Sequence, residues 1–306
     1  MGALIERADV LVENFRPGTL DRLGFDPKTL ADLNPRLIVL SISGFGHDGP
    51  DGARAGYDQI AQGEAGLMSL TGPGPEDLQR VGVPIGDLLA GMYGVYGALA
   101  AVHEREKTGL GQVVRTSLLA AIVGVHAFQG TRWTVANEVG RAQGNHHPSI
   151  APYGLFRASD GPVQIAAGSE SLRNTLCGVI GIDPETPEFA TNAERVTHRD
   201  QLISTLEAAI SDVPSADLLS RLADAGAPAG VVRTLDEVYE WEQTASQGLV
   251  ITVDHPVLGA IKLPGPPLRF FDTDGGEHTR VKHAPPPTLG QHNEAIRRWL
   301  SEPSAP

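Results

Sequence analysis

The sequence predicts an α/β protein, and its first 46 residues carry the pattern that indicates this class. Residues 10–12 are a short apolar run, and residues 27–33 form a capped, helix-like segment. Residues 36–43 then have the pattern of a buried strand that ends in the glycine turn 44–46. Strand, helix, strand and glycine turn in this order are typical of α/β folds. Ligands bind beyond the carboxyl ends of such strands, so we expect residues 14–22 and the glycine turn to lie near a site.

Length and composition predict a soluble protein of two domains. The chain has 306 residues, 24 basic and 37 acidic, and its net charge of −13 argues against a nucleic-acid surface. A single cysteine, Cys177, excludes an internal disulfide and indicates a cytoplasmic location. Acidic residues interrupt any leader-like run in residues 1–9. The longest apolar run, residues 88–102, is shorter than the ~20 residues that span a bilayer, so we expect no membrane partner.

We expect a large domain in residues 1–150, a small α/β domain in 151–235, and a linker with a C-terminal return to the large domain in 236–306. In the large domain the patterns predict helices at 19–23, 57–68, 84–107 and 118–133, and a strand at 111–117. Beyond it they predict a hairpin at 154–167, helices at 171–180, 199–209, 215–225 and 293–300, a strand pair at 251–253 and 260–263, and a frayed tail at 301–306.

The helix expected at 84–107 is rich in small residues, with Asp87 at its start. Each glycine inside a helix costs roughly 1 kcal/mol relative to alanine, so the glycines at 91, 94 and 97 indicate close packing. At helical spacing, residues 87, 91, 94, 98 and 101 share one face. A carboxylate in the first turn meets free N–H groups and the positive end of the helix dipole, which favour its ionised form. Asp87 is therefore either a helix cap or a pre-positioned anion.

The most specific string is Asn14-Phe15-Arg16-Pro17-Gly18-Thr19-Leu20-Asp21-Arg22-Leu23-Gly24. By itself it is a turn with a short helix, and its arginines could be ordinary surface charges. Together with the Pro-x-x-Asp-x-x-x-Gly segment at 84–91, however, it resembles family III CoA-transferases, the formyl-CoA and carnitine-CoA transferase group. The resemblance continues in order through residues 43–46, 54–58, 144–148, 152–153, 160–161, 190–195, 226–232 and 285–292.

This resemblance implies a Rossmann-like large domain, a smaller α/β domain and a CoA site. It places in the CoA site the residues Asn14, Phe15, Arg22, Leu23, Arg54 and Tyr57. An aromatic face suits the adenine base and an arginine fork suits phosphate. CoA or acyl-CoA is expected as a substrate, with no permanently bound cofactor. His146 and His147 are adjacent on a loop without a third ligand, so we expect no metal.

The implied reaction moves CoA from an acyl-CoA thioester to a free carboxylic acid. Asp87 would form an aspartyl anhydride and then an aspartyl-CoA thioester, and backbone N–H groups of the Gly144 loop would stabilise the oxyanion. The family resemblance also implies an interlocked homodimer. Two alternatives stay open: a 2-methylacyl-CoA racemase, which uses a histidine where this chain has Tyr57, and a catalytically impaired CoA-binding paralogue.

One departure from the family concerns the start of the chain. Family members begin with a further β-α-β segment, whereas this sequence starts just before Asn14. We therefore expect the large domain to be N-terminally incomplete, which would affect the sheet and the activity of the 306-residue chain.

Overall fold

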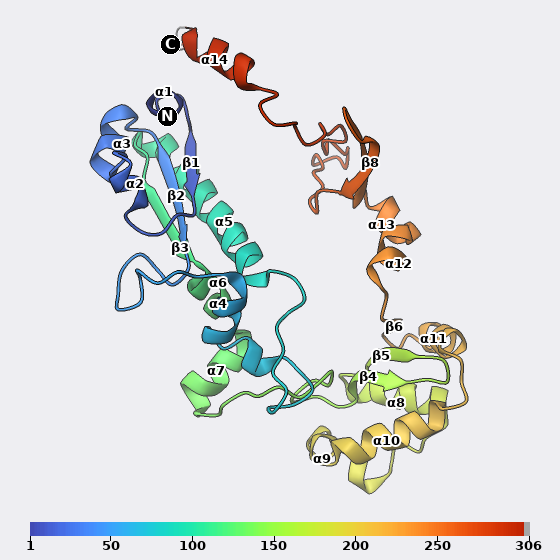
Figure 1. Cartoon of the computed structure of the whole chain (residues 1–306). Coiled ribbons are helices and arrows are strands. Elements are labelled where there is room, and N and C mark those ends of the chain that lie inside the picture. Colours follow the sequence, from blue (N-terminus) through green and yellow to red (C-terminus); the bar gives the residue numbers. More distant parts are fainter. Residues whose placement is uncertain (303–306) are drawn as a thin grey trace. The chain divides into compact units, whose positions relative to one another are not determined.

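The computed structural model describes residues 1–302, which form two compact units, and the boundary between them in the chain lies between Pro148 and Ser149 (Figure 1). Both units combine helices with a small sheet, and the predicted α/β class is confirmed. The division of the second unit at residue 235, and the return of residues 236–306 to the large domain, stay predictions. Of the predicted tail 301–306, only the first two residues are described, and Ser301 still belongs to the last helix.

The first unit contains a parallel sheet of three strands in the order β1-β2-β3. These strands are β1 Val10–Glu13, β2 Ile38–Ser43 and β3 Val113–Ser117. Leu40 of β2 pairs with Val114 of β3, and both side chains face the long helix α5. One position further along the strands, Glu13, Ser41 and Arg115 form a row across β1, β2 and β3. Because alternate residues of a strand point to opposite faces, this row lies on the face away from α5.

Most helices of this unit lie in the predicted segments, but the short helices at residues 2–5 and 68–70 were not predicted, and the segment 118–133 differs. They are α1 Gly2–Ile5, α2 Thr19–Arg22, α3 Pro27–Leu33, α4 Asp58–Glu64, η1 Met68–Leu70, α5 Ile85–Thr108, α6 Leu118–Gly124 and α7 Ala127–Ala136. The prediction of a single helix at 118–133 is wrong, because the helix is interrupted between α6 and α7. Gly124 ends α6, and Ala127 has a positive φ of 48° at the start of α7. A backbone in the left-handed region cannot continue an α-helix.

Helix α5 lies along the sheet, as Figure 1 shows, and glycines make the close approach possible. A Cβ atom at Gly94 would lie 2.9 Å from Leu40, and one at Gly97 would lie 2.6 Å from Val114. The buried positions of α5 are 86, 90, 94, 101 and 105. The predicted small-residue face at 87, 91, 94, 98 and 101 is therefore turned by about one residue, and Asp87 lies beside the packed face.

Among residues 1–302, α5 is also one helix that is long and apolar enough to cross a membrane, by length and composition. At 24 residues it exceeds the apolar run of 88–102 on which the sequence argument rested. A single such helix is weak evidence, since core helices of soluble proteins meet the same criterion. Its packing on β2 and β3 accounts for its small residues.

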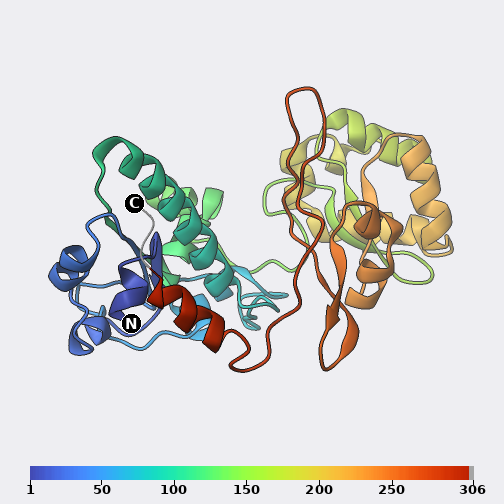
Figure 2. The same ribbon diagram turned by 90° about the horizontal axis from the view of Figure 1, so that it is seen from above.

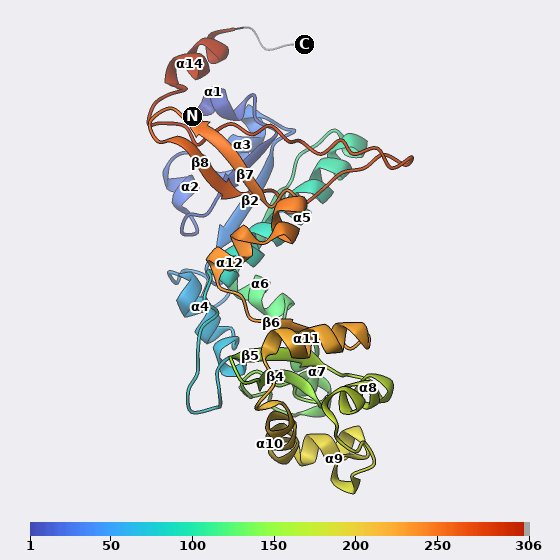
Figure 3. The same cartoon turned by 90° about the vertical axis from the view of Figure 1, so that its right-hand side faces the viewer.

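The second unit is built on an antiparallel sheet in the order β4-β5-β6, with β4 Tyr153–Arg157, β5 Pro162–Ala166 and β6 Ala229–Val231. Figure 3 shows α8 Glu170–Ile180, α10 Arg199–Ile210 and α11 Ser215–Asp224 around it. η2 Pro187–Phe189 and α9 Asn192–Thr197 lie between α8 and α10 in the chain. Buried side chains of the sheet and these helices form one core, which includes Phe156, Leu176, Leu206 and Leu222. The predicted hairpin and helices are confirmed here.

The remaining chain of this unit contains α12 Leu235–Glu240, α13 Glu242–Ser246, the hairpin of β7 Val250–His255 and β8 Gly259–Pro264, and α14 Asn293–Ser301. The predicted strand pair is confirmed, with His255 paired to Gly259 at the turn. Between β8 and α14 the chain follows a long irregular path, coloured orange to red in Figure 2.

Candidate active site

Asp87 lies in the first turn of α5 and is exposed. Pro84 is the N-cap residue and supplies no side-chain hydrogen bond to the helix. Asp87 is two residues inside Ile85, where the helix begins, and so it is not the cap. Of the two roles left open by the sequence, the structure therefore favours the positioned carboxylate.

The cap of α5 comes from another helix, α4. Asp58, the first residue of α4, accepts a hydrogen bond from the backbone N–H of Gly86 through Oδ1 at 2.7 Å. Its other oxygen, Oδ2, accepts from Gln62 Nε2, also at 2.7 Å. The Gln62 side chain is fully buried and accepts from the Val81 N–H at 2.9 Å. Asp58 and Gln62 thus fasten the segment 81–86 that leads into the first turn of α5.

Partial burial of the Asp87 carboxyl raises its pKa above the usual aspartate value, and the negative charge of Asp58 raises it further. This direction is opposite to the one expected from the helix dipole alone. The dipole argument is wrong here because desolvation and a neighbouring carboxylate outweigh it. A carboxylate that is less well stabilised by its surroundings is a more basic nucleophile.

Gly144 lies on a loop that is held against residues 69–73. Its φ of +67° is in the left-handed region, which favours glycine. The Gly144 N–H donates to the Gly72 carbonyl at 2.9 Å, and the Ala142 N–H donates to the Ser69 carbonyl at the same distance. In this conformation the amide of Gly144 is therefore engaged, and an oxyanion role for it requires exchange of that bond.

Arg54 and Tyr57 flank the start of α4. The Arg54 guanidinium makes a two-pronged ion pair with Glu64 and stacks 4.5 Å above the Phe45 ring. Glu64 raises the pKa of Arg54, which keeps it charged. Tyr57 is the N-cap residue of α4, and its side chain is 72% exposed. Arg54 borders the glycine turn after β2 through Phe45, and the backbone of Gly56 lies against that of Gly44 in the same turn.

The other four predicted CoA residues lie in the segment that follows β1. Asn14 and Phe15 come directly after the strand, Arg22 ends α2, and Leu23 is the C-cap residue of α2. All of them are exposed: Asn14, Phe15, Arg22 and Leu23. The Phe15 N–H donates to Glu13 at 2.8 Å, and Arg22 folds back to Thr19 at the same distance. The segment that follows β1 thus carries an exposed aromatic ring, Phe15, and an exposed guanidinium, Arg22.

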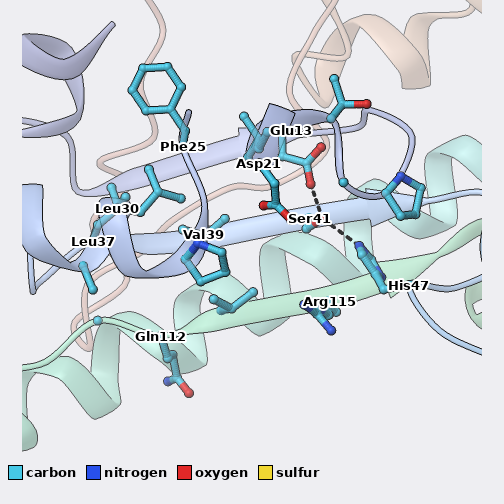
Figure 4. Close-up of a pocket in the computed structure, with 18 of the residues that line it drawn as sticks. Glu13, Asp21, Phe25, Leu30, Leu37, Val39, Ser41, His47, Gln112 and Arg115 are labelled. Atoms are coloured by element: carbon cyan, nitrogen blue, oxygen red, sulfur yellow. Dashed lines mark hydrogen bonds between the residues drawn. The ribbon is translucent and has the colours of Figure 1, made fainter. Parts of the chain in front are cut away.

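A cavity of about 360 Å³ lies next to this turn, on the face of the sheet away from α5 (Figure 4). Its walls are apolar at Leu30 and Val39, and polar where Ser41 contacts both Glu13 and His47. The Ser41 hydroxyl lies 2.7 Å from His47 Nε2. Burial lowers the pKa of His47, and the charge of Arg115 lowers it further, so the surroundings favour the neutral ring.

None of Asn14, Phe15, Arg22 and Leu23 lines this cavity, although Arg16 and residues 17–21 do. Sequence reasoning also missed the Glu13-Ser41-His47 cluster, because it depends on strand register. In the sequence, Asp58 stood out only as one residue of the segment 54–58, which resembles the family. A carboxylate that opens a helix just before a glycine-rich helix was the available signal for Asp58. Among the described residues, no group of three His, Cys, Asp or Glu side chains could hold a metal ion.

The family profile of CoA-transferase family III matches residues 1–293. The chain belongs to CoA-transferase family III. An acetyl-CoA:oxalate CoA-transferase of Acetobacter aceti is 35% identical over 99% of this chain and 76% of its own length. A mouse succinyl-CoA:glutarate CoA-transferase is 33% identical over 94% of this chain and 65% of its own length. The chain thus spans about two thirds to three quarters of these relatives.

A crystal structure of a CaiB/BaiF family protein from Brucella suis superposes with a TM-score of 0.83 at 36% identity, covering 98% of this chain and 77% of that one. The family III resemblance and fold are therefore confirmed. The relatives are named as CoA-transferases, which confirms the predicted enzyme class. The roles of individual residues stay predictions.

Proposed function

We propose that this family III CoA-transferase moves CoA from an acyl-CoA thioester to a free carboxylic acid, with Asp87 as the covalent nucleophile. The observation that carries the proposal is the place of Asp87. It is an exposed carboxylate in the first turn of α5, beside Asp58, and its raised pKa makes it more basic than a free aspartate. The exchange of one thioester for another is nearly balanced, so catalysis requires only a covalent relay.

The relay has four steps. An Asp87 oxygen attacks the carbonyl carbon of the donor thioester, the C–S bond breaks, and an aspartyl anhydride and CoA thiolate form. The thiolate then attacks the aspartyl carbonyl, giving an aspartyl-CoA thioester and releasing the donor acid. The acceptor carboxylate then attacks the carbonyl carbon of this thioester, the C–S bond breaks, and a second anhydride and CoA thiolate form. Finally the thiolate attacks the acceptor carbonyl of the anhydride, which releases the Asp87 carboxylate and the new acyl-CoA. The proposed oxyanion donors are N–H groups of the Gly144 loop.

CoA binding is proposed at the carboxyl end of the parallel sheet. Phe15 would stack on the adenine, Arg22 would bind phosphate, and Asn14 and Leu23 would complete the contact. Arg54 and Tyr57 would lie nearer the reacting carbonyl, since they adjoin Asp58. CoA thioesters are substrates in this scheme, and no permanently bound cofactor is needed. The relatives named for oxalate and glutarate support a small acid as the acceptor.

The assembly proposed is an interlocked homodimer that acts in the cytoplasm. Apolar side chains of α5 away from the sheet support a protein partner, because five of them are at least half exposed: Leu88, Met92, Val95, Tyr96 and Leu99. The single cysteine suits a reducing compartment.

Deuterium incorporation tests the reaction class. In D2O the protein is incubated with a 2-methylacyl-CoA and an added carboxylic acid, and products are analysed by mass spectrometry. A transferase yields the acyl-CoA of the added acid, while the recovered 2-methylacyl group carries no deuterium at the α-carbon. Tyr57 supports this outcome, because a tyrosine is a poorer second base for proton transfer than the histidine that a racemase uses.

Rapid α-deuteration without CoA exchange would instead make the protein a racemase and overturn the proposal. Binding of CoA without either reaction would identify a CoA-binding paralogue, and would overturn it as well.

A further inference from the structure

The start of α5 lacks the capping side chain that a helix of 24 residues usually has. Pro84 occupies the N-cap position and has no side-chain acceptor. The Gly86 N–H would therefore lack a helix partner, like the other N–H groups of a first turn. In the structure it donates to Asp58 Oδ1 at 2.7 Å, across 28 residues of sequence. The cap is thus supplied by the helix α4, which precedes α5 in the chain.

The fit around this hydrogen bond is tight. A Cβ atom at Gly86 would lie 3.1 Å from Asp58 Oδ1 and 3.1 Å from Ile122 of α6. Glycine at this position lets the Asp58 carboxylate and α6 both approach the backbone. Gln62, fully buried one turn later in α4, holds the second oxygen of Asp58. It also bonds the Val81 N–H, so both ends of the segment 81–86 are fixed to α4.

We infer that Asp58 is a positioning residue, with Gln62 as its anchor, that caps α5 from outside and fixes the first turn on which Asp87 lies. The link to catalysis rests on the proposed function, whereas the capping role does not. A nucleophile displaced by about 1 Å can lose roughly 10²-fold in rate, so a rigid first turn has a kinetic consequence.

Asp58 has a second effect through its charge. Its negative charge disfavours the ionised form of Asp87, in addition to the effect of burial. Asp58 is the charged side chain that acts on Asp87 among the residues that the structure describes. Removing that charge while keeping an acceptor oxygen should therefore lower the pKa of Asp87.

Hydrogen exchange and kinetics of Asp58→Asn and Asp58→Ala in the full chain test the inference. Exchange of the peptide covering 82–88 is followed by mass spectrometry, and CoA transfer is measured from pH 4 to 8. Glu76→Gln is the matched control, because it removes an exposed carboxylate from the preceding loop.

In Asp58→Ala, exchange of the 82–88 peptide should rise about tenfold or more. kcat should fall by roughly 10-fold to 100-fold, with KM for acyl-CoA changing less than about threefold. In Asp58→Asn, exchange should rise less than in the alanine variant, because the amide oxygen still accepts from Gly86, and the acid limb of the kcat profile should move to lower pH. Glu76→Gln should match the wild type.

Unchanged exchange in Asp58→Ala would overturn the capping role, whatever the activity does. An unchanged acid limb of the kcat profile in Asp58→Asn would overturn the effect of the Asp58 charge on Asp87. If exchange rises but kcat stays unchanged, the capping role is supported and the positioning role of Asp58 in catalysis is overturned. The role of Asp87 as nucleophile is decided by Asp87→Ala, which separates the two proposals. The asparagine variant keeps the test decisive if the alanine variant does not fold.

Discussion

Arg195 connects three segments of the second unit through one buried guanidinium. It is 2% exposed and donates to the Ala151 carbonyl at 2.6 Å and the Phe189 carbonyl at 2.9 Å. It also pairs with Glu170 at 2.5 Å. A buried cation is stable only when its hydrogen bonds and its charge are matched, and this one has both.

Replacing it should therefore be costly. Arg195→Met keeps much of the side-chain volume but leaves buried carbonyls without donors. We expect the free energy of unfolding to fall by about 3–5 kcal/mol, measured by urea denaturation. Arg157→Met, on an exposed position of β4, should change it by less than about 0.5 kcal/mol. Equal effects of the two variants would show that the Arg195 network does not stabilise the unit.

Glu170 gives this network a pH dependence. The charge and hydrogen bonds of Arg195, and then those of Arg173, hold the pKa of Glu170 below its usual value. A lowered folded-state pKa adds stability above the unfolded pKa, near 4.5, and this stability is lost as pH falls through the folded value. Glu170→Gln should thus lower Tm at pH 7, and the difference should shrink as the pH falls below about 4.5 and through the lowered pKa of Glu170. A difference that is constant with pH would contradict the pairing.

The sequence predicted individual residues better than it predicted the side chains that contact them. It predicted Asp87 in the first turn, but it gave the wrong direction for its pKa. The dipole is a property of the helix itself, whereas Asp58 reaches Asp87 only through the packing of α4 on α5. Likewise, Glu13, Ser41 and His47 meet because of strand register and a loop, which no local pattern contains.

Helix α5 shows what glycines do at the level of an element. Gly97 lies under Val114, where a Cβ atom would approach to 2.6 Å, while nothing lies within 4 Å of a Cβ atom at Gly91. The two glycines lie six residues apart on the same helix, so they form a matched pair.

We expect Gly97→Ala to lower the free energy of unfolding by about 1–3 kcal/mol through overpacking. Gly91→Ala should raise it by about 0.5–1 kcal/mol, because alanine is the better helix former. Urea denaturation of both variants checks this. Destabilisation by Gly91→Ala and tolerance of Gly97→Ala would contradict the packing of α5 on β3.

The sequence predicted the longer helices and most strands, because periodicity and caps are local, but it missed short elements such as α9, α12, α13 and β6. It erred where contacts decide. Small residues at 91, 94 and 98 look alike in sequence, so the packed face of α5 could not be placed to within one residue. The break between α6 and α7 follows from the positive φ of Ala127, a conformation that alanine rarely adopts and the sequence does not indicate.

At the scale of the molecule, the apolar face of α5 defined by Leu88, Met92, Val95, Tyr96 and Leu99 leads to a prediction about assembly. Sedimentation equilibrium should give twice the chain mass. The double change Val95→Lys and Leu99→Lys should abolish the dimer, since two charges would have to be buried. Leu110→Lys, beyond the end of α5 and 60% exposed, should leave it intact. A wild-type protein that sediments as a monomer at micromolar concentration would contradict the proposed homodimer.

The family and the fold were predictable from the sequence because matching strings occur in the right order along nearly the whole chain. The chemistry of a site is less accessible, since it depends on which residues the fold brings to Asp87. The proposed reaction depends on that one carboxylate.

Trapping the covalent intermediate tests this most directly. The protein is incubated with an acyl-CoA, hydroxylamine is added, and peptides are mapped by mass spectrometry. We expect one aspartyl hydroxamate, at Asp87, with Asp58 unmodified, and no transfer by Asp87→Ala. A label confined to another residue, or appreciable transfer by Asp87→Ala, would contradict it.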